Sequence, residues 1–343
     1  MKPGAQTPYV SVILPVYNSA LYIGEAIESI LAQSFKDLEI LVYDDCSTDN
    51  TVAVIQKYQD PRIRLIRKEV NTGITGSLIM GVAAANGKYI VRMDGDDVSD
   101  LHRIERQVDF LEGHPEHGVV GSWVQTIPSK GEAHVWEYPL EHEDIQLHLL
   151  VNAPFAHPSV AIRREVLIKH NINYSVVHEP AEDYKLWTDI LKVSKGANLP
   201  EVLLHYRLHE SQTISTKRAR VIERSNQVRK EVVQFFFEES MSGEEVLVHY
   251  FYFNEIPSKD APSIEAFAAW RKKLTGWFSR KGEGRKGVEL VDRYWLIHLR
   301  CLSVYKPSYL LYLADRAVLA ELTFKEVVRF IGKSLIGYRI RQA

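Results

Sequence analysis

Three aspartates stand close together in the segment YIVRMDGDDVSD at 89–100, namely Asp94, Asp96 and Asp97. Like charges at this spacing raise one another's energy unless a positive charge lies among them. A hard divalent cation suits the donor set, because magnesium is usually held by one or two protein carboxylates and completes its shell with water and phosphate oxygens. The pattern therefore predicts a site for Mg²⁺ or Mn²⁺ that bridges to a diphosphate.

Polar residues also gather after two earlier apolar runs. PVYN at 15–18 follows the first run, and DDCSTD at 44–49 follows the second. Each group alone is as consistent with ordinary turns and helix caps, because Asp, Asn and Ser close turns and cap helices. Three such groups at corresponding places favour one shared binding site.

The segments that must position these residues alternate in type over the first 120 residues. Short apolar runs predict strands at 10–14, where Pro15 ends the run, and at 38–43, 62–66 and 89–93. Helical spacing predicts helices at 23–33, 49–58 and 76–85. Strands separated by helices imply an α/β fold with a mostly parallel sheet, whose ligands lie outside the carboxyl ends of the strands.

Composition limits the classes of function. The chain has 343 residues, of which 45% are hydrophobic and 25% are charged, as in an ordinary soluble protein. Its formal net charge of −2 gives no overall attraction for nucleic acid. No apolar run approaches the roughly 20 residues that cross a bilayer, and the N-terminus lacks a secretory leader. We therefore expect a cytoplasmic protein.

Two other nucleotide-binding classes are disfavoured. A dinucleotide site needs a G-x-G-x-x-G turn after the first strand, where this chain has PVYNSALYIG. A sugar nucleotidyltransferase should carry a Gly-rich phosphate loop at the same place, and PVYNSA is not one.

Seven segments resemble the family 2 glycosyltransferases with the GT-A fold, in particular the bacterial members that build capsular and lipopolysaccharide glycans. They are VSVILPVYN at 10–18, SILAQSFKDLEILVYDDCSTDNT at 29–51, NTGITGSLIMGVAAANGKYIVRMDGDD at 71–97, HRIERQ at 102–107, HPSVAIRREVL at 157–167, AEDYKLW at 181–187 and YRLHESQTIS at 206–215. The resemblance predicts a GT-A domain at 1–215, which is a Rossmann-like, mostly parallel sheet with flanking helices.

The resemblance also implies a role for most of the polar residues. Asp44 or Asp45 would hold the base and ribose of a nucleoside diphosphate sugar, most often a uridine diphosphate sugar. Asp96 would lie nearest the metal, with Asp94 toward the ribose. The other nucleotide-sugar contacts that it implies are Pro15, Tyr17, Asn18, Gly73, Arg92 and Asp97.

Glu182 and Asp183 resemble the family's E-D pair at the start of a helix, in which the second carboxylate is the general base. Burial or a carboxylate neighbour raises the pKa of such a base toward the working pH. Without the other motifs, acidic residues stabilised by the helix dipole would be the simpler interpretation. The resemblance implies a single displacement that inverts the anomeric carbon.

Three further side chains have two interpretations each. Arg207 and His209, in YRLH, either reach the diphosphate or pair with surface acids. His157, in HPS, either shapes the acceptor site or is a buried structural histidine.

The chain departs from the family in one helix. Many members carry an arginine and an asparagine after the glycine turn, where this chain has Leu78 and Ile79. One polar contact to the donor is then absent or comes from another side chain, for which Arg92 and Arg103 are the candidates. The departure leaves the donor sugar open.

Residues 216–343 match no family that we can name, and their spacing predicts a mainly helical region. Between 270 and 288, seven basic residues stand against one acidic residue among Trp270, Trp277 and Phe278. From 309 onward, apolar residues alternate with Arg316, Lys325, Arg329, Lys333, Arg339 and Arg341. Such a surface either rests on the inner face of an anionic membrane, near a lipid-linked acceptor, or is a solvated face over an aromatic helical core.

These observations predict a metal-dependent, inverting glycosyltransferase that moves a hexose or N-acetylhexosamine from a nucleoside diphosphate sugar to a growing surface glycan. A non-catalytic nucleotide-sugar-binding protein remains the alternative, because binding and catalysis share most of these residues.

Overall fold

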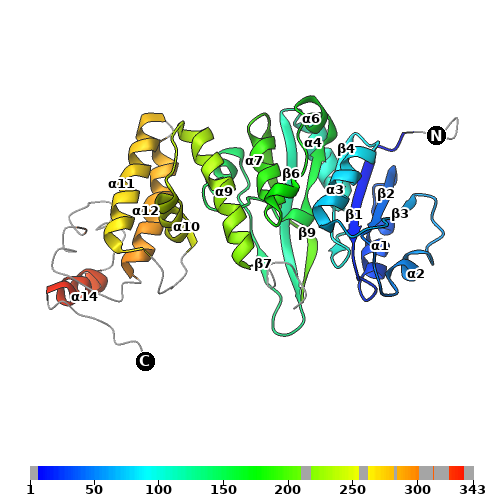
Figure 1. Cartoon of the computed structure of the whole chain (residues 1–343), viewed down its shortest axis with the longest axis horizontal. Coiled ribbons are helices and arrows are strands. Elements are labelled where there is room, and N and C mark those ends of the chain that lie inside the picture. The colour runs from blue at the N-terminus through cyan, green and yellow to red at the C-terminus, as the bar shows by residue number, and fades with distance from the viewer. Residues whose placement is uncertain are drawn as a thin grey trace. The chain divides into compact units, whose positions relative to one another are not determined.

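The structure is a computed structural model that describes residues 7–209, 218–254, 262–281, 284–300, 312 and 324–335. The chain divides into two compact units, Met1–Val232 and Val233–Ala343. Unit 1 is an α/β sheet with flanking helices, and the described part of unit 2 is helical (Figure 1). The predicted α/β class and the predicted helical C-terminal region are confirmed, and the functional division at 215 stays a prediction.

Unit 1 is built on one twisted sheet, with strands in the order β3-β2-β1-β4-β8-β6-β9-β5. The first four strands are all parallel. They are β3 (Ile63–Arg67), β2 (Leu38–Asp44), β1 (Val10–Val16) and β4 (Tyr89–Arg92). The other half mixes directions and contains β8 (Ala161–Arg163), β6 (His117–Pro128), β9 (Lys195–Leu208) and β5 (Val98–Ser99), while β7 (Val135–Trp136) pairs with β6 off this path.

Helices connect these strands. In unit 1 they are α1 (Ile23–Ala32), α2 (Thr51–Ile55), α3 (Gly73–Ala84), α4 (Arg103–Gly113), α5 (His142–Leu149), α6 (Arg164–Lys169) and α7 (Glu182–Leu191), with 3-10 turns η1 (His157–Ser159) and η2 (Val176–His178). Helix α9 (Arg218–Phe237) runs from unit 1 into the first residues of unit 2, which also holds α10 (Gly243–Asn254), α11 (Ile264–Lys281), α12 (Gly284–Arg300) and α14 (Phe324–Leu335).

The first strand is longer than predicted, because Pro15 does not end it. Pro15 stands opposite Tyr43 of β2, and pairing continues to Val16. Alternation turns the nitrogen of Pro15 toward β4, yet β4 pairs with β1 only as far as Ile13. The missing N–H therefore removes no bond from the ladder, and proline is tolerated at this place.

Two predicted helices also have other bounds. The helix predicted at 49–58 is shorter in the structure, because α2 covers only Thr51–Ile55. The helix predicted at 76–85 begins earlier, at Gly73. Gly73 has a φ of +79°, a backbone conformation that favours glycine. The helix therefore starts where the chain can make this sharp entry.

The turn between α3 and β4 packs directly on β1. The hydroxyl of Ser11 accepts hydrogen bonds from the amides of Asn86 and Gly87 at 3.1 and 2.8 Å. A Cβ on Gly87 would stand 2.5 Å from the Ser11 nitrogen. This close approach places β4, and hence the aspartates that follow it, beside β1.

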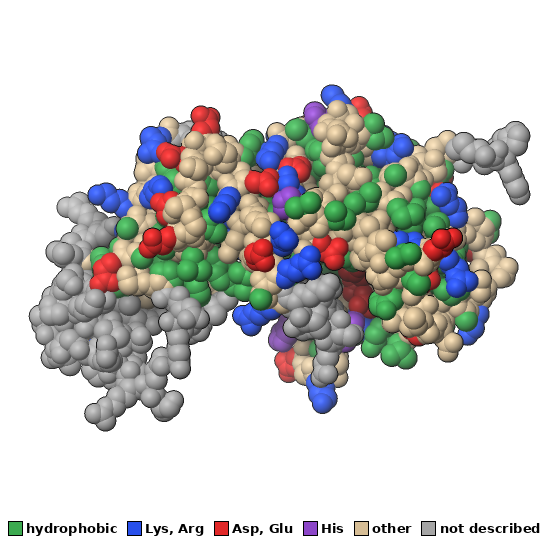
Figure 2. Space-filling model, viewed as in Figure 1, with side chains coloured by type: hydrophobic (Ala, Val, Ile, Leu, Met, Phe, Trp, Pro, Cys, Tyr) green, Lys and Arg blue, Asp and Glu red, His purple; other side chains and the backbone are tan. Residues whose placement is uncertain are grey.

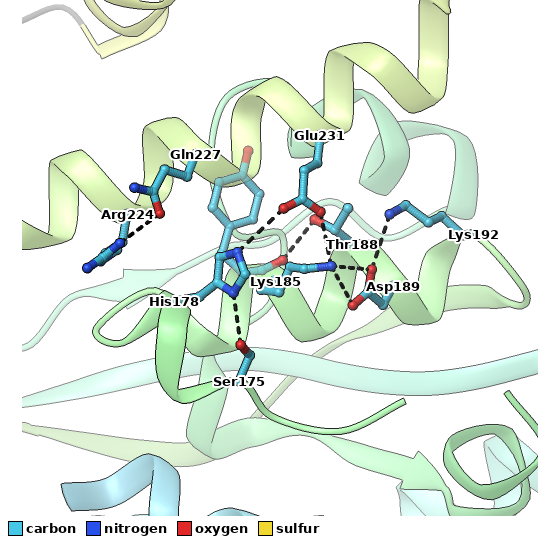
Figure 3. A network of polar contacts seen from close by, with 10 residues as sticks. Ser175, His178, Lys185, Thr188, Asp189, Lys192, Arg224, Gln227 and Glu231 are labelled. Carbon is cyan, nitrogen blue, oxygen red and sulfur yellow. Dashed lines mark hydrogen bonds and ion pairs between the residues drawn. The ribbon is translucent and has the colours of Figure 1, made fainter. Parts of the chain in front are cut away.

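Helix α9 is fastened to α7 by a polar network (Figure 3). The carboxylate of Glu231 on α9 lies 3.0 Å from Lys185 Nζ and 3.4 Å from His178 Nε2. Lys185 also pairs with Asp189 at 2.7 Å. Because Glu182 and Asp183 form the first turn of α7, the network holds the helix that presents them.

The aromatic residues of the basic segment at 270–281 lie inside unit 2. Trp270, Trp277 and Phe278 are all buried. Neighbouring cations are paired, with Arg271 on Asp292 at 2.7 Å and Lys273 on Glu245 at 2.5 Å. Of the two alternatives for this segment, the structure therefore supports a helical core that contains the aromatic side chains.

The described surface carries both charges. Figure 2 shows Lys and Arg side chains interspersed with Asp and Glu on the face in view. Arg316, Arg339 and Arg341, which were predicted to be part of a basic surface, lie outside the described residues. None of the described helices is long and apolar enough to span a membrane.

The close packing at Gly87 predicts a clear loss of stability when a methyl group is added there. We expect Gly87→Ala to cost about 2 kcal/mol or more, because the clash is with backbone atoms that cannot move aside. Thermal unfolding should show a midpoint several degrees lower. Gly113→Ala is the matched control, because a Cβ on Gly113 meets nothing within 4 Å. An equal midpoint for the two variants would contradict this packing.

Candidate active site

The loops that follow β1 and β2 are tied to each other at the carboxyl edge of the sheet. Asn18 accepts a hydrogen bond from the amide of Thr48 at 2.9 Å and donates its own amide to Ser47 Oγ at 2.9 Å. Asn18 and Cys46 both have positive φ angles, 49° and 67°. Tyr17 is half exposed above these turns. Asn18 thus ties the turn after β1 to the loop after β2, with Tyr17 exposed next to it in the chain and Pro15 buried in the end of β1.

The two aspartates at the end of β2 have different surroundings. Asp44 is buried and accepts the amide of Ser47 at 3.3 Å. Asp45 accepts the amide of Thr72 at 3.0 Å and lies 2.5 Å from Lys68 Nζ, with both side chains of the ion pair only 5% exposed. Buried ion pairs persist when other hydrogen bonds complete them, as Thr72 does here. Asp45 therefore anchors the loop that leads to Gly73.

Gly73 lies against the loop that precedes α7. A Cβ built on Gly73 would stand 3.1 Å from a carboxylate oxygen of Glu179. Glu179 is three residues before Glu182, so this contact brings the start of α3 close to the start of α7. The predicted site residue Gly73 and the predicted catalytic pair are therefore neighbours through this loop.

The three aspartates after β4 form a compact cluster. Asp94, Asp96 and Asp97 each offer a carboxylate oxygen, and these oxygens lie within 4.8 Å of one another. Arg92, which is buried, donates to both oxygens of Asp94 at 2.7 and 2.5 Å. Oδ2 of Asp97 is buried and has no hydrogen-bond partner among the described residues.

The electrostatics of the cluster fit a divalent cation. Burial, together with the charges of Asp94 and Asp96, holds the pKa of Asp97 well above its usual range. Burial also raises the pKa of Asp94, although the charge of Arg92 opposes the shift. A buried carboxylate oxygen without a partner beside two further carboxylates is a donor set that Mg²⁺ or Mn²⁺ can satisfy.

The end of β9 closes over this cluster. Arg207 donates its amide to Asp97 Oδ1 at 2.9 Å and its Nε to the Asp96 carbonyl at 2.8 Å. Nε2 of His209 lies 2.7 Å from Asp96 Oδ2. The Arg207 guanidinium also lies over the ring of Tyr22, at 4.7 Å from its centroid. Both residues contact the acidic loop, and Arg207 also pairs with Glu25 at 2.5 Å.

Glu182 is buried and Asp183 is partly buried, and both interact electrostatically with Arg92. Burial and the charge of Asp183 raise the pKa of Glu182 to about 8, and Glu182 Oε2 has no hydrogen-bond partner in the part of the chain described. Burial also raises the pKa of Asp183, while the amide of Tyr184 and the charge of Arg92 oppose the shift. The negative charge of Asp94 raises the pKa of Asp183 further, so the aspartate cluster after β4 and Asp183 interact electrostatically.

His157 lies next to the same region. Its Nε2 is 2.9 Å from the hydroxyl of Tyr174, and its ring meets the edge of Trp187. Burial and the charge of Arg92 hold the pKa of His157 well below its usual range, so the ring is neutral near pH 7. His157 thus packs against Tyr174 and Trp187 inside the protein, and its part in acceptor binding stays a prediction.

The side chain of Arg103 is not accessible to a nucleotide-sugar donor. It is fully buried and donates to the carbonyl of Arg92 at 2.8 Å, which holds the end of β4. Sequence reasoning overlooked Lys68, Tyr174 and Glu179, which touch predicted site residues. Tyr206 was overlooked as well, although it opens the YRLH motif; burial and the charges of Asp94, Asp97 and Asp96 raise its pKa.

The arrangement combines a carboxylate cluster that could hold a cation with a carboxylate of raised pKa. The cluster of Asp94, Asp96 and Asp97 can hold a metal ion with a diphosphate. Asp183 can accept a proton once it is ionised. Groups with these two properties on one site suit transfer of a group from a diphosphate to a hydroxyl.

Comparison with known sequences points the same way. A sequence model described as glycosyl transferase family 2 matches residues 11–170. An uncharacterized glycosyltransferase of Haemophilus influenzae is 34% identical over 240 residues, 67% of this chain and 74% of that protein. The Escherichia coli protein WfaP, named a UDP-Glc:alpha-D-GlcNAc-diphosphoundecaprenol beta-1,3-glucosyltransferase, is 29% identical over 225 residues, 63% of this chain and 84% of that protein.

A solved structure shares the fold. S. aureus TarS 1-349, in complex with UDP-GlcNAc, superposes with a TM-score of 0.58 over 94% of this chain and 90% of that chain. The two sequences are 18% identical, so the likeness concerns the fold. It confirms the predicted GT-A architecture.

The raised pKa of Glu182 predicts how stability depends on pH. Because the folded state holds this proton more tightly than the unfolded chain does, wild type should lose stability as pH rises from about 4.5, the ordinary glutamate value, to about 8. Glu182→Gln removes the titration, so we expect it to be more stable than wild type at pH 9, by on the order of a few kcal/mol. Thermal unfolding at pH 5 and pH 9 checks this. A variant that gained nothing at pH 9 would show that Glu182 is ionised without cost.

Proposed function

Because the chain belongs to the glycosyl transferase family 2 and is therefore a glycosyltransferase, we propose that it moves a hexose or N-acetylhexosamine from a nucleoside diphosphate sugar to a hydroxyl group of a growing surface glycan. The observation that carries the proposal is the carboxylate cluster after β4, which stands within electrostatic reach of Asp183. A diphosphate site and a base are then held in one place.

The donor is proposed to lie along the carboxyl ends of β1, β2 and β4. Its base and ribose would rest between Tyr17 and the loop that begins at Asp44, because these turns are tied together and Tyr17 exposes its ring there. Asp45 is engaged by Lys68 and Thr72, which favours Asp44 as the direct partner. A uridine diphosphate sugar is our first choice, as in the names of WfaP and the TarS complex.

The metal ligands are proposed to be Asp96 and Asp94, with Asp97 beside them. Arg92 binds both oxygens of Asp94 and His209 lies 2.7 Å from one oxygen of Asp96, so the unpartnered oxygen of Asp97 would complete the donor set. A bound Mg²⁺ or Mn²⁺ would supply positive charge where the diphosphate leaves. Arg207 and His209 hold the acidic loop in position from the end of β9.

Asp183 is proposed to be the general base. As the acceptor oxygen attacks the anomeric carbon, its proton passes to the Asp183 carboxylate, and the bond from that carbon to the diphosphate breaks with its electrons on the leaving oxygen. The raised pKa makes Asp183 a stronger base once it is ionised. Attack from the face opposite the diphosphate inverts the anomeric carbon.

The acceptor is proposed to be a sugar joined through a diphosphate to a membrane lipid. The name of WfaP, which describes a diphosphoundecaprenol acceptor, supports this choice. Helix α14 adds the exposed side chains of Val328 and Ile331 beside Lys325 and Arg329, a composition that suits an anionic membrane surface.

Asp183→Asn should abolish transfer and leave the affinity for the donor within a few-fold of wild type. The asparagine side chain still has an oxygen that accepts a hydrogen bond from the Tyr184 amide. It cannot take the proton of the attacking sugar hydroxyl. Product formation and nucleotide calorimetry measure the two effects. Asp109→Asn, at an exposed position on α4, is the matched control and should retain activity. Full turnover by Asp183→Asn would remove the base assignment.

Asp96→Ala should weaken donor binding at least ten-fold in the presence of Mn²⁺, because a metal ligand is lost. Calorimetric titration with uridine, guanosine and thymidine diphosphates and their sugars, with metal and then with a chelator, provides the measurement and tests the function itself. Asp109→Ala, an exposed position on α4, controls for general loss of charge. If no nucleotide bound wild type with metal present, the proposed function would be wrong.

A further inference from the structure

An exposed tryptophan lies beside the site and has no role in the chemistry above. Trp136 in β7 is 39% exposed. In contrast, Trp187, Trp270, Trp277 and Trp295 are at most 3% exposed. An aromatic ring with one face open to solvent offers a large, rigid apolar surface on which a ligand can pack.

The sheet register places Trp136 on the face that holds the acidic cluster. Trp136 stands opposite Val124 of β6, and Val124 stands opposite Leu204 of β9. Tyr206 follows Leu204 by two residues, so its side chain is on the same face. The rings of Trp136 and Tyr206 accordingly meet, with centroids 5.3 Å apart.

Tyr206 connects the tryptophan to the aspartates. Strand β5 pairs with β9 at Val98 and His205, so the residue before Val98, Asp97, is level with Tyr206. The amide of Arg207, next after Tyr206, donates to Asp97 Oδ1 at 2.9 Å. Trp136, Tyr206 and Asp97 therefore form a continuous row from an exposed ring to the proposed diphosphate site.

The segment after β7 approaches the proposed base. Tyr138 is two residues beyond Trp136, and its carbonyl accepts the indole N–H of Trp123 at 3.2 Å. Burial and the charge of Asp183 raise the pKa of Tyr138 to about 12, so this tyrosine lies within electrostatic reach of that carboxylate. The segment 136–138 thus carries both the ring that contacts Tyr206 and a hydroxyl that senses the charge of the proposed base.

We propose that Trp136 is a subsite for the acceptor, on which one pyranose ring of the glycan stacks. The C–H bonds on one face of a pyranose carry partial positive charge and suit the electron-rich face of an indole, and stacking removes apolar area of both from water. This proposal rests on the proposed function and adds the residue that selects and orients the acceptor.

The test is direct binding of simple pyranosides to the full chain, with UDP and Mn²⁺ present and absent. Saturation-transfer NMR with the methyl α- and β-glycosides of glucose, galactose, mannose and N-acetylglucosamine identifies those that bind and the ring face that contacts protein. We expect at least one to bind, Trp136→Ala to weaken it about ten-fold, and Trp136→Phe to keep it within about three-fold.

Phe235→Ala is the control, because Phe235 is an aromatic residue on α9 with a similar exposure of 40%. It should bind the pyranosides as wild type does. Trp136→Ala should also keep wild-type affinity for UDP and the rate at which donor is hydrolysed without acceptor, whereas its KM for acceptor rises. If the proposed function were wrong, wild type itself would bind no nucleotide, and that result is distinguishable from a failure of the subsite. Binding of no pyranoside, or equal binding by Trp136→Ala and wild type, would overturn the subsite.

Discussion

The repulsion among three carboxylates at the end of β4 is the constraint around which unit 1 is organised. Asp94, Asp96 and Asp97 lie within 4.8 Å of one another, and a partly buried place with little water screens them poorly. Arg92 neutralises one of them from inside the sheet. Arg103 donates a hydrogen bond to the carbonyl of Arg92, although burial lowers the pKa of the Arg103 guanidinium to about 9. The end of β4 is therefore held by a side chain whose charge is costly to bury.

Long-range connections complete the same site. The end of β9 reaches the acidic loop from more than 100 residues away, with Arg207 in the strand and His209 just after it. Helix α7 contributes the second acidic pair and is itself fixed by Glu231 of α9. The proposed chemistry would draw on elements from both halves of unit 1, and the packing of α9 against α7 bears on the position of Asp183. Neither contact is local in the chain.

The sequence predicted the parts of this arrangement that depend on local pattern. Apolar runs and the polar residues after them located β1, β2 and β4 and the cluster at Asp94, because parallel strands bring their carboxyl ends to one edge. It did not predict the Arg92 pairing, the buried role of Arg103 or the contact of Trp136 with Tyr206. These depend on register and on which side chains face each other across strands distant in the chain, and periodicity carries no such information.

The contact of Gly73 with Glu179 has a consequence for how such a chain can vary. Any side chain at position 73 would both adopt an unfavourable φ and press on the loop that leads to α7. A change there would displace the Glu179 carboxylate as well as disturb the entry to α3. Variation at position 73 is therefore limited by the side chain at 179 as well as by the backbone angle of Gly73 itself.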